Sequence, residues 1–164
     1  MARVLVQMIG LRRLPQLLPF LLIAALGAGC GGGKQQVTAA ELDRKADQIC
    51  GEEQAEFRRI QAHPPASASE AADQTKELIQ AAESANSAIG DLEPPDALRA
   101  PLDAYLNARD RAIEEMKRGE SAAENQDSRA YGTAQAAVAK SAPQRKRLAE
   151  SLGLKVCSSK PRAV

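Results

Sequence analysis

Apolar residues recur at helical spacing along the body of the chain, and pairs of prolines separate the runs. One run steps by four and three residues through Ala71, Thr75, Leu78, Ala82, Ala85, Ile89 and Leu92. Another comprises Leu42, Ala46, Ile49, Cys50, Phe57 and Ile60. Because each run lies on one face of a helix with charged residues around it, the sequence predicts amphipathic helices and an all-α fold.

Side chains able to cap helices predict where the first two begin. Thr38 with Glu41, and Ser67 with Glu70, have the spacing of capping boxes. In such a box the hydroxyl accepts an early backbone N–H and the carboxylate reaches back to the cap residue. The first helix is expected to end at His63, ahead of two prolines, with the imidazole bonding terminal carbonyls.

The third helix is expected to be capped by Asp96 and to end at Gly119. Its apolar positions are Leu98, Leu102, Tyr105, Ala112, Ile113 and Met116. Pro101 should lie in its first turn, because proline has no N–H to donate deeper in a helix. A capping box from Ser121 to Glu124 would then start the next segment.

The fourth segment carries apolar residues at Tyr131, Ala134, Val138, Leu148 and Leu152. Gly132 and Pro143 interrupt it, so the helix is expected to be kinked or to begin late. Gly153 should take the left-handed conformation at its end, with Leu154 folding back and residues 156–157 leaving as extended chain. Four segments with short joins predict an antiparallel up-down bundle of four helices over residues 38–157. Three helices, one of them long and kinked, are the alternative.

The first 29 residues have the order of an export signal. Arg3, Arg12 and Arg13 precede an apolar run and then small residues. About 16 apolar residues would form a helix of roughly 24 Å, which is shorter than the ~30 Å hydrocarbon thickness. A permanent transmembrane anchor is therefore the weaker interpretation, and a twin-arginine signal would need residues that do not follow Arg13.

The segment from Leu26 to Cys30 resembles the lipobox of bacterial lipoproteins. The resemblance implies diacylglyceryl transfer to Cys30, cleavage before it and retention at the extracytoplasmic face of the cell membrane. The position three before the cysteine, usually leucine, is Gly27 here. A soluble secreted protein cleaved near Ala28 is the alternative, as is a start at Met8. Residues 30–37 would form a flexible glycine-rich linker.

With Cys30 acylated, Cys50 and Cys157 remain as an even pair in an oxidising compartment, which predicts a disulfide. The bond would matter because the core is thin: the chain has no Trp and only two Phe and two Tyr. Alanine favours helices but buries little apolar area. A redox role would need an activating base or a Cys-x-x-Cys spacing, and neither is present.

Charge is distributed unevenly, with an acidic body and a basic tail over residues 158–164. Between Glu41 and Asp127 the chain has 20 acidic and 10 basic residues. That balance argues against a nucleic acid partner. The tail could meet anionic lipid headgroups or be a solvated helix end. Glu52, Glu53 and Glu56, followed by two arginines, predict a solvated, salt-bridged helix face.

No catalytic, metal or cofactor motif is evident. His63 is the single histidine and has no partner at metal-ligand spacing, and no serine lies in a Gly-x-Ser-x-Gly elbow. The cysteine-containing helix, the Pro-Pro joins and the terminal Gly-Leu-Lys-Val-Cys resemble uncharacterised actinobacterial-type secreted helical lipoproteins. We therefore expect a non-enzymatic interaction or structural module at the cell envelope, with an envelope protein or polymer as partner. The alternative is a binding module for a small ligand or envelope polymer.

Overall fold

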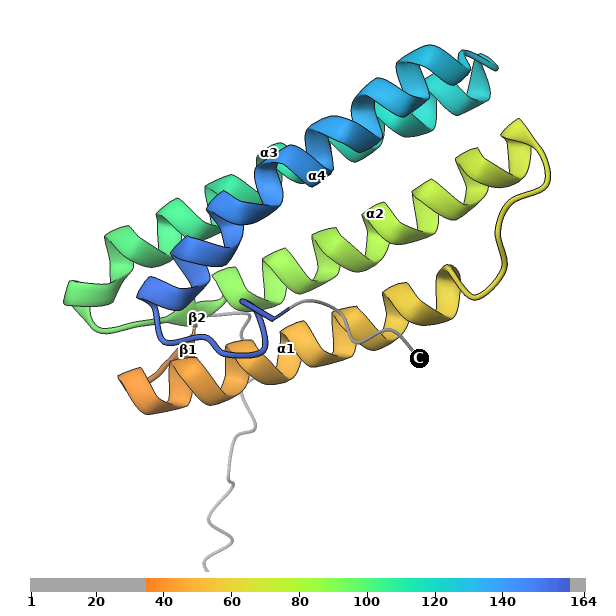
Figure 1. Cartoon of the computed structure of the whole chain (residues 1–164). Helices are drawn as coiled ribbons and strands as arrows, with labels where there is room; N and C mark the ends of the chain where they lie inside the picture. The colour runs from red at the N-terminus through yellow and green to blue at the C-terminus, as the bar shows by residue number, and fades with distance from the viewer. Residues whose placement is uncertain (1–34, 160–164) are drawn as a thin grey trace, which may run out of the picture. The chain divides into compact units, whose positions relative to one another are not determined.

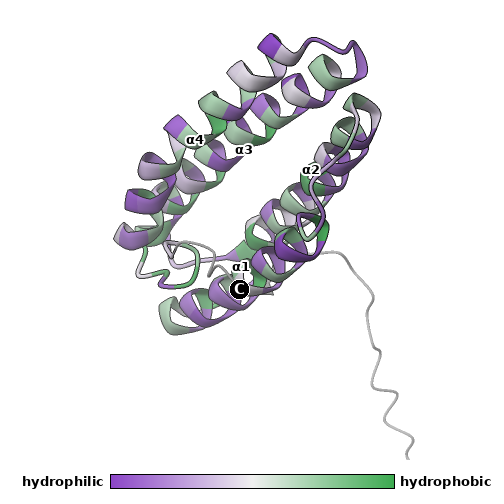
Figure 2. Cartoon of the chain, turned by 45° about the vertical axis from the view of Figure 1, so that its right-hand side comes forward, coloured by the Kyte–Doolittle hydropathy of each residue, from purple (hydrophilic) through white to green (hydrophobic). Residues whose placement is uncertain are grey.

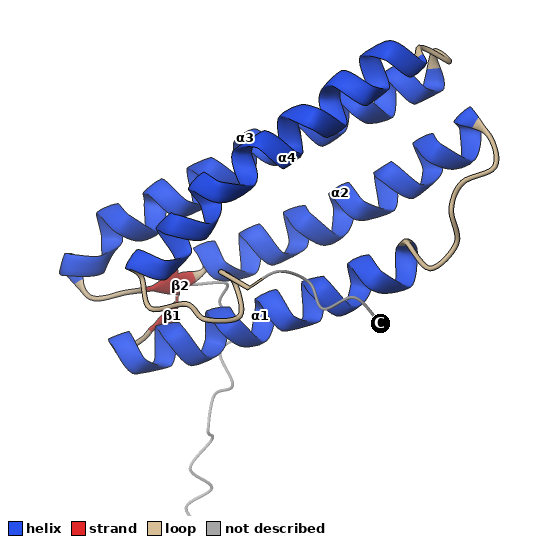
Figure 3. Cartoon of the chain, in the orientation of Figure 1, coloured by secondary structure: helices blue, strands red, loops and turns tan. Residues whose placement is uncertain are grey.

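The structure, a computed structural model of the chain, describes residues 35–159. Its helices are α1 (Ala39–Ile60), α2 (Ala68–Gly90), α3 (Asp96–Glu124) and α4 (Ser128–Ser151), and its strands are β1 (Gln35–Gln36) and β2 (Leu92–Glu93) (Figure 1; Figure 3). The all-α, four-helix prediction is confirmed, and the three-helix alternative is wrong. The expected export signal, Cys30 and residues 160–164 lie outside the described residues.

The helices pack in chain order, α1 against α2, α2 against α3 and α3 against α4. They alternate in direction, so that α1 and α3 begin at the end of the bundle where α2 and α4 finish (Figure 1). Hydrophilic and hydrophobic residues alternate along every helix, as the amphipathic pattern predicted (Figure 2). After α4 the chain turns back across α1.

The largest apolar cluster, the main core cluster, lies at the end where α1 begins. Its members are Val37, Leu42, Ala46, Cys50, Ile89, Leu92, Leu102, Tyr105, Ala149, Leu152 and Leu154. Towards the other end the clusters are smaller and contain more alanine. The bundle therefore buries most of its large side chains at one end.

The predicted helix starts at Thr38 and Ser67 are both present. Thr38 and Glu41 form a complete capping box, in which the Glu41 carboxylate accepts the Thr38 N–H at 2.8 Å. Ser67 accepts the Glu70 N–H at 3.1 Å, while the Glu70 carboxylate accepts the N–H of residue 66. All of the predicted positions from Ala71 to Leu92 are buried.

Two expectations about the start of α3 are corrected: the cap lies one residue earlier than Asp96, and Pro101 does not lie in the first turn. Asp96 is the first helical residue, and the cap position is Pro95, which offers no side-chain bond. Pro101 therefore lies beyond the first turn. The turn before it stays helical because Leu98 and Leu102 pack on the main core cluster.

The expected end of α3 at Gly119 is wrong, as is a capping box at Ser121. The helix continues to Glu124, and Gly119 is buried inside it. A Cβ atom at Gly119 would lie 3.5 Å from the Cβ of Ala134 in α4. Glycine here allows two helices to approach closely, which local sequence patterns do not distinguish from a helix stop.

The join between α3 and α4 is made by residues 125–127. Gln126 has φ 58°, and Asp127 caps α4 by accepting the Ala130 N–H at 2.9 Å. From there α4 runs as one helix through Pro143, so the expected late start is wrong. The Val138 carbonyl near the proline accepts the Ser141 hydroxyl at 2.8 Å.

The end of α4 matches the prediction. Gly153 has φ 81°, its N–H bonds Glu150, and the Leu154 N–H bonds Ala149 O at 3.0 Å. This is a Schellman motif, and Leu154 folds back into the core with no exposed surface. Residues 156–157, expected to be extended, form a turn instead, because the Ser158 N–H bonds the Leu154 carbonyl.

The short parallel strands were not predicted. Gln35 pairs with Leu92 and Gln36 with Glu93, and the Val37 N–H donates to the Glu93 carbonyl at 3.0 Å. Val37 is buried in the main core cluster. The expected flexible linker is thus corrected for residues 35–37, because burying Val37 holds this polar stretch against the join between α2 and α3.

Substitutions at Gly119 test the close approach of α3 and α4. Gly119→Ala should stabilise the protein by ~0.5–1 kcal/mol, because alanine favours the helix and its Cβ finds only ordinary contacts. Gly119→Leu should destabilise it by ~1–3 kcal/mol by forcing the helices apart. Urea unfolding measures both changes.

Gly132 in α4 provides the matched control. A Cβ there meets nothing within 4 Å, so both Gly132→Ala and Gly132→Leu should stabilise the helix. Equal effects of leucine at the two glycines would contradict the packing role of Gly119.

Candidate functional site

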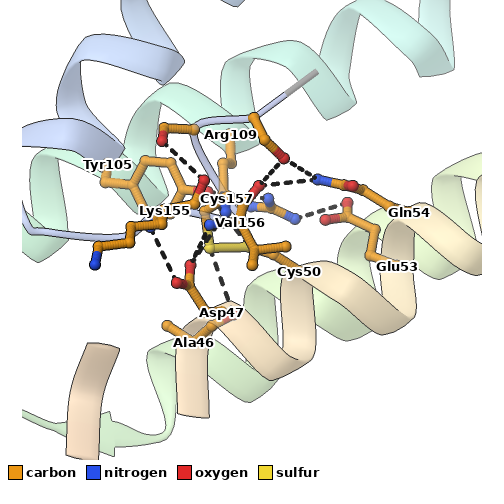
Figure 4. Close-up of a disulfide and its surroundings, with 12 residues drawn as sticks. Ala46, Asp47, Cys50, Glu53, Gln54, Tyr105, Arg109, Lys155, Val156 and Cys157 are labelled. Carbon is orange, nitrogen blue, oxygen red and sulfur yellow. Dashed lines mark hydrogen bonds and ion pairs between the residues drawn. A yellow bond between two sulfur atoms is a disulfide. The ribbon is translucent and has the colours of Figure 1, made fainter. Parts of the chain in front are cut away.

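A disulfide joins Cys50 in α1 to Cys157 in the C-terminal segment, as the sequence predicted (Figure 4). The two Cα atoms are 5.2 Å apart and 107 residues apart in sequence. Cys50 belongs to the main core cluster, and Cys157 packs partly buried against it. The bond therefore ties the last described segment to the helix that begins the bundle.

Asp47, almost one turn before Cys50, holds the same segment through its backbone. Its carboxylate accepts the N–H groups of Lys155, Val156 and Cys157 at 3.0, 2.8 and 3.2 Å. Gln54 donates to the Val156 carbonyl at 2.9 Å. Bonds to a charged acceptor are stronger than neutral ones, so Asp47 fixes the turn that presents Cys157.

Arg109 of α3 connects three helices beside the disulfide. Its guanidinium donates to Glu53 of α1 at 2.8 Å, Asn86 of α2 at 3.0 Å and the Tyr105 hydroxyl at 3.3 Å. The Arg109 and Glu53 side chains are only 11% and 12% exposed. Burial works to lower the pKa of Arg109, but the charge of Glu53 raises it overall. Arg109 therefore keeps its charge inside the bundle.

The position of Glu53 corrects one expectation from the sequence. Glu52, Glu53 and Glu56 were expected to share a solvated face. Glu56 does pair with Arg59 in solvent, but Glu53 points inward to Arg109. It lies three residues after Cys50, on the buried side of α1. The partner that makes its burial tolerable is 56 residues away, so local charge patterns could not reveal it.

Tyr105 lies between Arg109 and the disulfide and is 1% exposed. Its hydroxyl lies 3.8 Å from the Cys50 sulfur, which has no proton in the disulfide, so the hydroxyl is the donor. Arg109 also lies over the ring, 5.7 Å from its centre. Burial raises the pKa of the Tyr105 phenol, against a smaller lowering by Arg109.

A cavity of about 90 Å³ adjoins this group, with walls from all four helices. Its apolar wall consists of Phe57, Ala82, Ala112, Ile113, Met116 and Val138. Glu53, Arg109 and Arg145 line its charged side. Burial, and then the like charge of Arg109, lowers the pKa of Arg145. No sequence motif predicted this site, because the residues that line it are spread from position 53 to position 145.

Other candidates lie outside this region. The His63 side chain is exposed, and Gln74 donates instead to the Ile60 carbonyl at the end of α1 at 2.8 Å and to the His63 carbonyl at 2.9 Å. Within residues 35–159 no three potential ligands gather as a metal site would require. No helix in that range combines the length and the apolar character needed to cross a bilayer.

Comparison with known proteins does not assign the chain. No protein-family model matches it, and neither a curated protein nor a solved structure is similar enough to count as a match. The functional argument therefore depends on the chain's own residues.

The disulfide can be tested with thiol-labelling reagents. Denatured, unreduced protein should show no reactive thiol at Cys50 or Cys157, and reduction should expose both. Reduction should also lower the free energy of unfolding by about 4.7 kcal/mol in the chain-entropy model, because the closed loop is long. Labelling of both cysteines without reductant would contradict the bond.

The environment of Tyr105 can be tested by alkaline titration. Because burial raises its folded pKa above the unfolded value of ~10, its contribution to stability is present below pH ~10. That contribution is lost as the pH rises through the folded pKa. When the native protein is titrated with alkali, tyrosinate absorbance should show one late phase, which is the ionisation of Tyr105 at a pH above the unfolded value.

Tyr105→Phe should remove the late phase. If the late phase persists in Tyr105→Phe, or if the native protein shows no such phase, Tyr105 is not buried as described.

Proposed function

We propose that the protein is a lipoprotein, anchored through Cys30 to the extracytoplasmic face of the cell membrane. There it would act as a non-enzymatic interaction or structural module. The Cys50–Cys157 disulfide supports this proposal most directly, because such bonds persist in oxidising, extracytoplasmic compartments. The lipobox-like residues before Cys30 supply the means of attachment.

The tether between anchor and bundle would be short. Cys30 and Gln35 are five residues apart, and a fully extended chain of that length spans about 17 Å. Gln35 is already held by pairing with β2. A lipid at Cys30 would therefore keep the end of the bundle that contains the main core cluster near the headgroups, and leave the far end free to meet a partner.

The C-terminal segment runs away from that end. Gly153 lies beside Asp43 at the start of α1, whereas Ser159 lies beside Gln54. Those two positions of α1 are about 16 Å apart along the helix axis. The last described residue, Ser159, thus lies about three helical turns along α1 from the end of the bundle that the anchor would hold.

The chemistry that the described residues bring together supports a non-enzymatic role. The charged groups beside the disulfide are engaged with one another, and the hydroxyl of Tyr105 donates to a sulfur. Among residues 35–159 the Thr38 hydroxyl donates to the Glu41 carboxylate at 2.9 Å, but that carboxylate also accepts the Thr38 N–H and belongs to the cap of α1. Turnover of an envelope substrate by the purified protein would contradict this part of the proposal.

The anchor can be tested by labelling cells with a fatty acid and identifying the mature N-terminus by mass spectrometry. The expected product begins at acylated Cys30 and fractionates with membranes. Cys30→Ser should lose the label and leave the membrane fraction.

Cys157→Ser is the matched control, since it removes a cysteine but leaves Cys30, and it should keep the label. A native protein that retains Met1 or Met8 and carries no acyl group would overturn the proposed anchor.

A second candidate function is a binding module for a small ligand held between the helices. The observation that favours it is the cavity where Glu53, Arg109 and Arg145 converge on an otherwise apolar space. Ligand sites commonly combine apolar walls with a few placed polar groups.

A further inference from the structure

The charges around the interhelical cavity do not cancel. Arg109 and Arg145 contribute two positive charges and Glu53 one negative charge, and the Glu53 carboxylate accepts from Arg109. Arg109 also bonds Asn86 and the Tyr105 phenol, which are neutral, and Asn86 in turn donates to Asp110, which does not line the cavity. The wall of the cavity thus carries one positive charge in excess.

That excess charge belongs to Arg145. Its guanidinium donates to the Val138 carbonyl and the Ser141 hydroxyl, two neutral oxygens of its own helix. In the part of the chain that the structure describes, no carboxylate lies within ion-pair distance of it. Its neighbour Lys146, by contrast, pairs with Glu150 in solvent at 2.7 Å.

A partly buried guanidinium beside another of like charge is unfavourable unless an anion compensates it. Arginine does not deprotonate in proteins, so the chain cannot relieve this charge by losing a proton. The lowered pKa of Arg145, caused by burial and by Arg109, agrees with this geometry. An anion beside Arg145 would remove the imbalance.

The space around Arg145 limits the size of a ligand that can bind there. Arg145 lines both the cavity and a groove of about 380 Å³ between α4 and residues 157–159. The inner cavity has about 90 Å³ and apolar walls. Since a cavity of roughly 150 Å³ accepts benzene, this one accommodates about four carbon atoms or fewer.

We propose that Arg145 and this cavity bind a short-chain carboxylate, with the carboxylate on the Arg145 guanidinium and the apolar chain between Phe57 and Val138. A planar guanidinium suits a carboxylate because it can donate two parallel hydrogen bonds. The proposal depends on the second candidate function, ligand binding between the helices, and is independent of the lipid anchor.

The test uses the exported, oxidised protein and ¹³C-labelled propionate, followed by NMR, at constant ionic strength set with sodium chloride. Propionate should bind saturably, and its neutral isostere propionamide should bind at least about tenfold more weakly, because it loses the charge-assisted bonds. Arg145→Met should weaken propionate binding by a similar factor.

Two further variants separate the site from general effects of charge or folding. Arg147→Met removes the same charge from an exposed position of α4 and should leave propionate binding unchanged. Ala112→Leu fills the cavity while keeping Arg145, and should weaken propionate at least tenfold with an unchanged circular dichroism spectrum.

The proposal is overturned if propionate acts no differently from chloride, or if Arg145→Met and Arg147→Met behave alike. Either result would leave the acylation of Cys30 untouched, because that is read from the mature N-terminus. Loss of the acyl group would likewise leave propionate binding intact.

Discussion

The attachment of the C-terminal segment to α1 is the constraint on which the rest of the structure depends. The helices pack in chain order, so α1 and α4 are the outer members of the series. Residues 152–157 connect them: Leu152 and Leu154 enter the main core cluster, Asp47 holds the backbone, and the disulfide makes the connection covalent. Without this connection α1 would depend mainly on its contact with α2.

That dependence reflects how the apolar residues are distributed. Large side chains gather where α1 begins, whereas the two clusters farther along have three buried residues each, and those of one cluster are all alanines. Alanine contacts each contribute little hydrophobic free energy, so the far end gains less from burial. The covalent bond joins Cys50 of the main core cluster to Cys157, and the buried charged pair of Glu53 and Arg109 lies beside it, where it lines the cavity next to Arg145. A buried pair of this kind is costly to break because one charge would remain without compensation.

Local signals predicted the first half of the bundle well and the second half less well. Thr38 and Ser67 mark helix starts because a cap depends on residues only three positions apart. Gly119, Pro101 and Pro143 were misleading because the same residue types serve both as helix ends and as tolerated interior positions. Packing against another helix decided between the two, as the contact of Gly119 with Ala134 illustrates. The pairing of Gln35 with Leu92 and the burial of Glu53 were missed for the same reason.

The sequence by itself determined the helical class, the caps of α1 and α2, the left-handed turn at Gly153 and the pairing of the two cysteines. Each of these depends on residue type or on neighbours within a few positions, except the cysteine pairing, which was predicted by expecting Cys30 to be acylated and two thiols to remain. Only the tertiary structure decided which charges are buried, where α3 gives way to α4, and that Arg145 faces a cavity beside Arg109. Those features arise from side chains on different helices meeting in space, and their energies depend on burial and distance rather than on local order.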